Sequence, residues 1–198
     1  MTVSVVSFIN ADFIMTVSTT IPTLMNKTLL SLFTAVASLT VSAPAVAQSN
    51  IDHHIRLVKA VKAVGVRFLI NPPACDEKPV YGWYSARNNE LVVCQENRIR
   101  YSSRPVDWTE EDLDTLRHEA HHVVQDCMDG RLQGDLGVVY KDPLELGVDV
   151  LGRDGVVQVV ERYDAAPDKV KVLEVEAFAV AAMNDPLEQV SDVYRYCF

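Results

Sequence analysis

Apolar residues recur at helical spacing most clearly between Thr109 and Asp129. One stripe of this segment faces a single direction and consists of Leu113, Leu116, Ala120, Val123, Val124 and Cys127. Thr109 followed by Asp112 resembles a capping box, acidic residues fill the first turn, and Gly130 is placed to end the helix. The pattern predicts a long amphipathic helix that packs on a core through this stripe.

Three further helices are predicted, over residues 50–64, 168–183 and 186–194, each bounded by a capping or breaking residue. Repeated glycines interrupt residues 130–166, where only a short helix near 155–163 is expected.

Short runs rich in β-branched and aromatic residues predict strands at residues 66–70, 80–85 and 90–95. A turn at residues 88–89 separates the last two. We therefore expect an α+β fold, in which a small twisted, mainly antiparallel sheet of about three strands packs on the 109–129 helix.

The chain is acidic, with 27 Asp and Glu against 18 Lys and Arg and a formal net charge of −9. Proteins that grip a phosphate backbone are usually basic, so nucleic acid is not expected as a partner. The hydrophobic fraction of 48% is that of an ordinary globular protein, and 198 residues favour one domain.

Residues 1–47 have the layout of a leader that ends in a secretory signal peptide, the signal proper covering about 25–47. Lys27 precedes an apolar run at 28–41, and a small-x-small cleavage site follows at Ala45-Val46-Ala47. The run is shorter than the ~20 residues that cross a bilayer, so no membrane span is expected after cleavage. Residues 48–198 are expected to form a single domain, secreted or periplasmic.

Four cysteines, an even number, read as two disulfides in an exported chain. Cysteines of a metal site are not expected, because the sequence has no Cys-x-x-Cys pair. Of the three pairings that four cysteines allow, we favour Cys75–Cys94, at neighbouring strand ends, and Cys127–Cys197, which would join the C-terminal tail to the main helix.

His118-Glu119-Ala120-His121-His122 is a complete H-E-x-x-H motif within the 109–129 helix. Residues four apart on a helix lie one turn above each other, so His118 and His122 can reach one metal ion. Glu119 flanks the same face, where it can take a proton from water at that ion. The two ligands lie away from the apolar stripe and are expected to face a cleft.

Zinc at a catalytic site usually has three protein ligands. His53 and His54 lie in the first turn of the N-terminal helix and are expected in solvent, so a carboxylate from the 168–183 helix remains. Glu176 falls among apolar residues on a helical projection, where a carboxylate needs a charged partner or a metal. Glu174 falls on the opposite side. Glu176 is therefore the expected ligand and Glu174 the alternative.

The H-E-x-x-H motif followed by Glu176-Ala177 on a later helix resembles the gluzincin pattern of zinc metallopeptidases, in a minimal single-domain form. The resemblance covers about residues 80–184, and only its zinc motif is specific. It implies a zincin-like fold, one Zn²⁺ per chain and a peptide or protein substrate. The substrate would pair with the edge strand before the motif helix, here Glu90–Gln95, and Glu119 would be the general base.

Related enzymes stabilise the oxyanion with a Tyr or His, for which the candidates are Tyr101, Tyr163, Tyr194 and His121. The imidazoles would be oriented by an acid, for which the candidates are Asp126, Asp149 and Asp154. The main alternative is a secreted zinc-binding interaction module without catalysis. Glu176-Ala177 is also similar to cytosolic regulatory proteases that cleave repressors, but the signal peptide and paired cysteines argue against that group.

Overall fold

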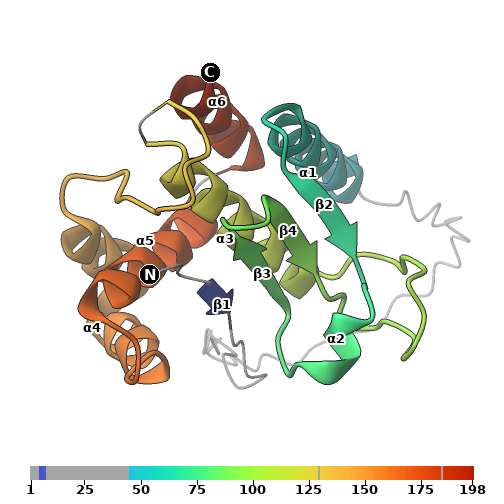
Figure 1. Ribbon diagram of the computed structural model, residues 1–198, viewed down its shortest axis with the longest axis horizontal. Coiled ribbons are helices and arrows are strands. Elements are labelled where there is room, and N and C mark those ends of the chain that lie inside the picture. Colours follow the sequence, from blue (N-terminus) through green and yellow to red (C-terminus); the bar gives the residue numbers. More distant parts are fainter. Residues whose placement is uncertain (1–4, 8–44, 129, 184) are drawn as a thin grey trace, which may run out of the picture.

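The structure is a computed structural model that describes residues 5–7, 45–128, 130–183 and 185–198 (Figure 1). The described part contains six helices and a small mixed sheet, which confirms the α+β class. In chain order the elements are β1 (Val5–Ser7), α1 (Ala45–Ala63), β2 (Arg67–Ile70), α2 (Ala74–Glu77), β3 (Gly82–Ser85), β4 (Glu90–Val93), α3 (Glu110–Asp126), α4 (Pro143–Arg162), α5 (Asp168–Met183) and α6 (Pro186–Cys197).

The strand order of the sheet is β1-β3-β4-β2. β3 and β4 form an antiparallel hairpin, whereas β2 pairs with β4 in parallel, from Arg67 opposite Glu90 to Ile70 opposite Val93. Two of the three pairings in the described sheet are antiparallel, as the sequence predicted, and the parallel β2–β4 pairing makes the sheet mixed. The chain returns through α2 and the hairpin before it reaches β4, so β4 runs in the same direction as β2 and lies between β2 and β3.

α3 forms the centre of the fold (Figure 1). It contacts β3 and β4 on one side, α5 on another, and α1 and α6 at its flanks. The predicted apolar stripe is buried, and so is every residue from His118 to Cys127. Thr109 and Asp112 form the expected capping box, in which each side chain binds the other residue's backbone amide. The helix is thus enclosed along most of its length.

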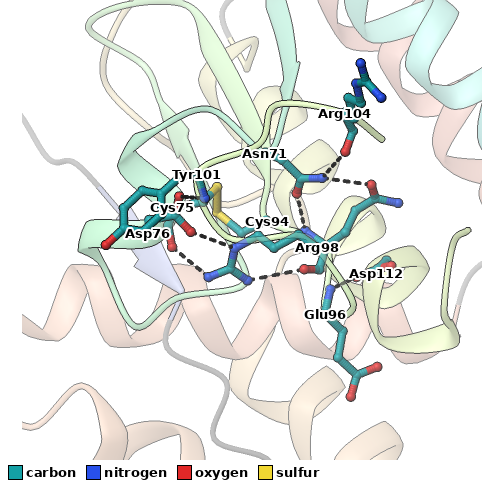
Figure 2. Close-up of a disulfide and its surroundings, with 10 residues drawn as sticks. Asn71, Cys75, Asp76, Cys94, Glu96, Arg98, Tyr101, Arg104 and Asp112 are labelled. Carbon is teal, nitrogen blue, oxygen red and sulfur yellow. Dashed lines mark hydrogen bonds and ion pairs between the residues drawn. A yellow bond between two sulfur atoms is a disulfide. The ribbon is translucent and has the colours of Figure 1, made fainter. Parts of the chain in front are cut away.

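A cluster of polar contacts fixes the segment that leads from β4 to α3 (Figure 2). Cys75 and Cys94 form a disulfide, and Arg98 donates from Nη2 to the Cys75 carbonyl at 2.7 Å. The Glu96 amide then donates to Asp112 Oδ1 at 2.7 Å, at the start of α3. These contacts anchor the N-terminal end of α3 to the sheet.

The second disulfide joins Cys127, just after α3, to Cys197 at the end of α6, with 4.9 Å between the two Cα atoms. Both favoured cysteine pairings are confirmed.

Two helices differ from their predicted extents. α1 begins at Ala45 rather than at an Asn50 cap, because the alanines and Gln48 before Asn50 are good helix formers. α4 covers 20 residues instead of a short segment, with non-helical backbone at Gly152 (φ 74°). The sequence does contain residues typical of a helix start, because Asp142 caps the helix and Pro143 occupies the first turn. The prediction gave more weight to the glycines that follow.

Most of the predicted signal peptide, residues 25–44, lies outside the described residues. Among the described helices, none combines the length and the apolar character needed to cross a bilayer.

Candidate metal centre

His118 and His122 point their Nε2 atoms at each other from successive turns of α3, at 3.1 Å. The two rings meet edge to face, with 4.8 Å between centroids, and both side chains are buried. The helical spacing predicted this juxtaposition. Both residues are nearly inaccessible to solvent, at 1% and 0% exposed, but His118 lines the pocket described below.

Glu174 of α5 completes the cluster. Its Oε2 lies 3.3 Å from His118 Nε2, and its Oε1 lies 3.6 Å from His122 Nε2. In a tetrahedral zinc site with bonds of about 2.0–2.1 Å, neighbouring ligand atoms are separated by about 3.4 Å. The 3.1 Å between the two imidazole nitrogens is close to this value, and so are the closest approaches of the two different Glu174 oxygens, at 3.3 and 3.6 Å. Glu174 therefore lies within reach of an ion held by the two histidines.

The structure does not bring Glu176, the predicted third ligand, to the histidine pair, because other groups hold its carboxylate. Oε1 accepts from His121 Nε2 at 2.8 Å and from Gln125 Nε2 at 3.1 Å. The backbone amide of Val139 approaches both oxygens, and that of Tyr140 donates to Oε2 at 3.1 Å. Glu176 is therefore satisfied by protein donors and organises the neighbouring segment instead.

The helical projection failed because α5 has two buried faces. It lies between α3 and α4, and both Glu174 and Glu176 are 0% exposed (Figure 1). An amphipathic analysis assumes one face in solvent, so it assigned Glu174 to the wrong environment.

The remaining histidines lie outside this cluster. His53 is half-buried beside Asp185, at 3.3 Å. His54 is 2% exposed, and its Nδ1 donates to the Asn50 carbonyl at 2.8 Å. The expectation that His54 is solvated is wrong, because α1 packs that side of its first turns against α3, where Arg117 contacts the His54 ring.

Burial sets the charge state of the triad. Desolvation lowers the pKa of His118 to about 3 and that of His122 to about 4, so both imidazoles are neutral at pH 7. Burial raises the pKa of Glu174 to about 7, although His122, a hydrogen bond from Tyr163 and the charge of Arg162 oppose the rise. Neutral imidazoles and a carboxyl group ready to ionise are a donor set that zinc favours.

The orienting partner of His122 is Gln125, which the sequence analysis missed. His122 Nδ1 donates to Gln125 Oε1 at 2.7 Å. The three-residue spacing on one helix was the available signal. The three acids expected in this role are elsewhere: Asp126 accepts from the Tyr84 hydroxyl and the amides of Gln133 and Gly134, and Asp149 and Asp154 are exposed on α4.

Of the four candidates for oxyanion stabilisation, the structure brings Tyr163 to the triad. Its hydroxyl lies close enough to Glu174 to lower the pKa of that carboxyl group, and its side chain is 8% exposed. Tyr101 and Tyr194 are 82% and 52% exposed, and His121 is engaged by Glu176.

Glu119 lies beside the two histidines on α3. One ligand atom from each of His118, Glu119 and His122 can be chosen so that all three lie within 4.8 Å of one another, and the three residues form a buried group that can hold a metal ion. β3 approaches this side of α3 closely. A Cβ on Gly82 would lie 2.6 Å from Thr115 Cγ2 and 3.3 Å from Glu119 Cγ, so only glycine fits there. β3, not the central strand β4, is therefore the strand next to the site.

A pocket of about 180 Å³ reaches His118 between α3, α4 and α5. Leu151, Val159 and Phe178 form apolar parts of its wall, and Phe178 packs on the His118 ring at 4.3 Å between centroids. Glu111 and Arg162 also line it. The pocket therefore ends against His118, at the edge of the His/Glu cluster.

Fold and geometry together define an α+β protein with a buried His/Glu cluster that can hold a metal ion. Residues 13–198 match the family described as "Domain of unknown function (DUF8637)", and the chain belongs to that family. No curated protein and no solved structure matches the chain. The gluzincin resemblance therefore stays a prediction, based on the motif.

Proposed function

We propose that this protein is a zinc-dependent metallopeptidase whose ion is held by His118, His122 and Glu174. The observation that carries the proposal is the convergence of these three buried side chains, whose closest donor atoms lie 3.1, 3.3 and 3.6 Å apart, with Glu119 beside them. Two neutral imidazoles and one carboxylate are the ligand set of catalytic zinc sites that leave one position open. This assignment keeps the gluzincin-like pattern but moves its third ligand from Glu176 to Glu174.

A zinc ion in such a site lowers the pKa of water and polarises a carbonyl group. Glu119 is the residue placed to take the proton of the attacking water and to return it to the leaving amine. Gln125 holds His122 through its amide oxygen, and the Tyr163 hydroxyl favours the ionised form of Glu174 by lowering its pKa. The site therefore contains a base and fixed ligands.

The substrate would approach along β3, which lies against Glu119. In the structure the outer edge of β3 pairs antiparallel with β1, so that Val5 lies opposite Tyr84 and Ser7 opposite Gly82. β1 belongs to the segment that we expect to be removed as a leader. Its cleavage would free this edge for the main chain of an extended peptide.

A second candidate function is a zinc-binding module without catalysis. The observation in its favour is the enclosure of the cluster, in which Glu119 is 0% exposed and near enough to act as a fourth ligand. Structural zinc sites are closed by four protein ligands. The pocket beside His118 favours the catalytic alternative, because a purely structural site needs no access.

We also infer that the protein is exported, in line with the signal peptide expected at residues 25–47. Two disulfides in one small domain support this, because such bonds persist in oxidising compartments. Both the periplasm and the medium satisfy this condition.

The variant Glu119→Gln separates the two functions. In a peptidase it keeps one zinc per chain but loses turnover by at least about 10²-fold, because only the proton transfer is removed. In a closed structural site it loses zinc, since a ligand is removed. Zinc content and cleavage of a quenched fluorescent peptide library are measured together, with Glu110→Gln, an exposed neighbour on α3, as control. A zinc-loaded wild type that cleaves no peptide, or a fully active Glu119→Gln, would contradict the proposal.

A further inference from the structure

Glu176 is the centre of a buried hydrogen-bond network that reaches the metal site through one side chain. His121 donates to it from the same helix as the metal ligands, and Gln125 donates to it at 3.1 Å. The backbone amides of Val139 and Tyr140 also donate to it. The carboxylate is therefore bound by donors from two directions.

The donors come from two parts of the chain that are far apart in sequence. One part is α3, and the other is the segment of residues 137–140, which precedes α4 and lacks regular structure. Besides the Val139 and Tyr140 amides on Glu176, the Gly137 amide donates to the Gln125 backbone carbonyl at 2.9 Å. The 137–140 segment is thus attached to both residues of the network.

The Gln125 side chain links Glu176 to His122, because it is hydrogen-bonded to both. Its Nε2 group donates both to Glu176 and to the Leu173 carbonyl, which fixes the orientation of the amide. Its Oε1 must then accept, so the proton of the neutral His122 ring resides on Nδ1. This tautomer leaves the lone pair on Nε2, the atom that faces His118 and Glu174.

We propose that Glu176 and Gln125 are positioning residues that couple the 137–140 segment to zinc affinity through the ring of His122. The inference rests on the proposed zinc site, and it concerns residues that do not bind the metal. When the segment is docked, Glu176 locks the Gln125 amide, and the Gln125 amide holds His122 in its metal-binding tautomer. Loss of either residue leaves the ring free to rotate or to change tautomer, at a cost in affinity.

Two variants test this coupling. Gln125→Leu keeps the side-chain volume but removes the acceptor of His122 Nδ1, and we expect zinc Kd to rise about 10–100-fold. Glu176→Gln is isosteric, but its amide group faces N–H donors where the carboxylate accepted them, and we expect a rise of about tenfold. Gln189→Leu is the control, because Gln189 is another buried glutamine whose Nε2 donates to the Arg117 carbonyl, outside the network.

Zinc Kd is measured by chelator competition, and the melting temperature of each metal-free protein is recorded beside it. The visible spectrum of the Co²⁺-loaded protein reports the geometry of the ligands, which a change in stability alone does not move. We expect weaker zinc binding and an altered cobalt spectrum in both network variants and neither in the control. If Gln125→Leu does not fold, Glu176→Gln decides.

Wild-type zinc affinity and cobalt spectrum in Glu176→Gln, whatever its melting temperature, would overturn the coupling and leave the proposed function intact. A wild-type protein that binds no zinc would overturn the proposed function, and this inference with it.

Discussion

Glu174 and Glu176 show how the neighbours of a buried carboxylate decide its role. The two residues are two positions apart on α5, and both are inaccessible to solvent. Glu176 meets N–H donors, which stabilise its charge at any ordinary pH. Glu174 faces two imidazole nitrogens and the Tyr163 hydroxyl, and burial raises its pKa to about 7. Glu174 has too few hydrogen-bond donors to stabilise a buried negative charge, so it is the carboxylate that a bound cation would stabilise.

The charge states predict how many protons zinc displaces. At pH 5.5 both histidines are already neutral, with pKa values of about 3 and about 4, whereas Glu174 is protonated below its pKa of about 7. Zinc binding at pH 5.5 should therefore release about one proton, from Glu174, and affinity should rise with pH until about pH 7. Calorimetry in buffers of different ionisation enthalpy measures this number.

Solvent-exposed histidines would give a different result. With ordinary pKa values near 6.5, both would be protonated at pH 5.5 and would release about two protons per zinc. A count near two would contradict the buried, neutral state of His118 and His122. The variant His54→Gln serves as the control, because His54 lies outside the site and should not change the count.

At this scale the sequence predicts what is local to one helix. The spacing of His118, Glu119 and His122 is set by helix geometry, and the structure reproduces it. The choice between Glu174 and Glu176 depends on which helices cover α5, a tertiary fact that no pattern along that helix contains. Gln125 is an intermediate case. Its three-residue spacing from His122 could be read from the sequence, but its hydrogen bonds to α5 could not.

α4 and α5 pack against each other, and a glycine on α4 makes a close approach possible. A Cβ on Gly147 would contact Val175 Cγ1 at less than van der Waals distance and would lie 3.1 Å from Val156 Cγ2. Val175 is the residue between Glu174 and Glu176, so this contact positions the ligand-bearing part of α5.

The substitution Gly147→Ala should therefore destabilise the protein by about 1–3 kcal/mol through overpacking. In an exposed helix interior the same change stabilises by about 0.5–1 kcal/mol, so the expected sign is opposite to the helix propensity. Denaturant unfolding of the two proteins measures the difference.

Gly137→Ala is the matched control, because the nearest atoms to its Cβ are those of Met128 at 3.4 Å, an ordinary contact. A Gly147→Ala protein as stable as wild type would show that α4 does not pack on α5 as described.

The extents of the elements follow from the sequence where one face is apolar and the ends are capped. α3 and α6 are of this kind, and their predicted bounds are nearly correct. α5 also matches its predicted bounds, although it is buried on two faces. α4 is not of this kind, because its glycines indicated breaks while at least Gly147 serves close packing. A glycine that permits close approach and a glycine that ends a helix look alike in one sequence.

At the scale of the whole molecule, the candidate metal site lies where α3 packs between the sheet and α5. The sheet carries Gly82 to one flank of α3, and α5 carries Glu174 to another, so the site assembles only when both layers are in place (Figure 1). The two disulfides hold the chain at both ends of α3: Cys75–Cys94 lies near its start, and Cys127–Cys197 follows its last residue. The α+β class and both cysteine pairings could be predicted, but the parallel β2–β4 pairing could not, because strand order depends on connections across the sheet.

The central claim is that Glu174, not Glu176, completes a zinc site with His118 and His122. The most direct measurement is zinc per chain by elemental analysis, with wild type, Glu174→Ala and Glu176→Gln each equilibrated with excess zinc and then freed of unbound metal. We predict one zinc per chain in wild type, none in folded Glu174→Ala, and near-complete occupancy in Glu176→Gln at saturating zinc. A folded Glu174→Ala that retains its zinc, or a wild type that binds none, would contradict the account.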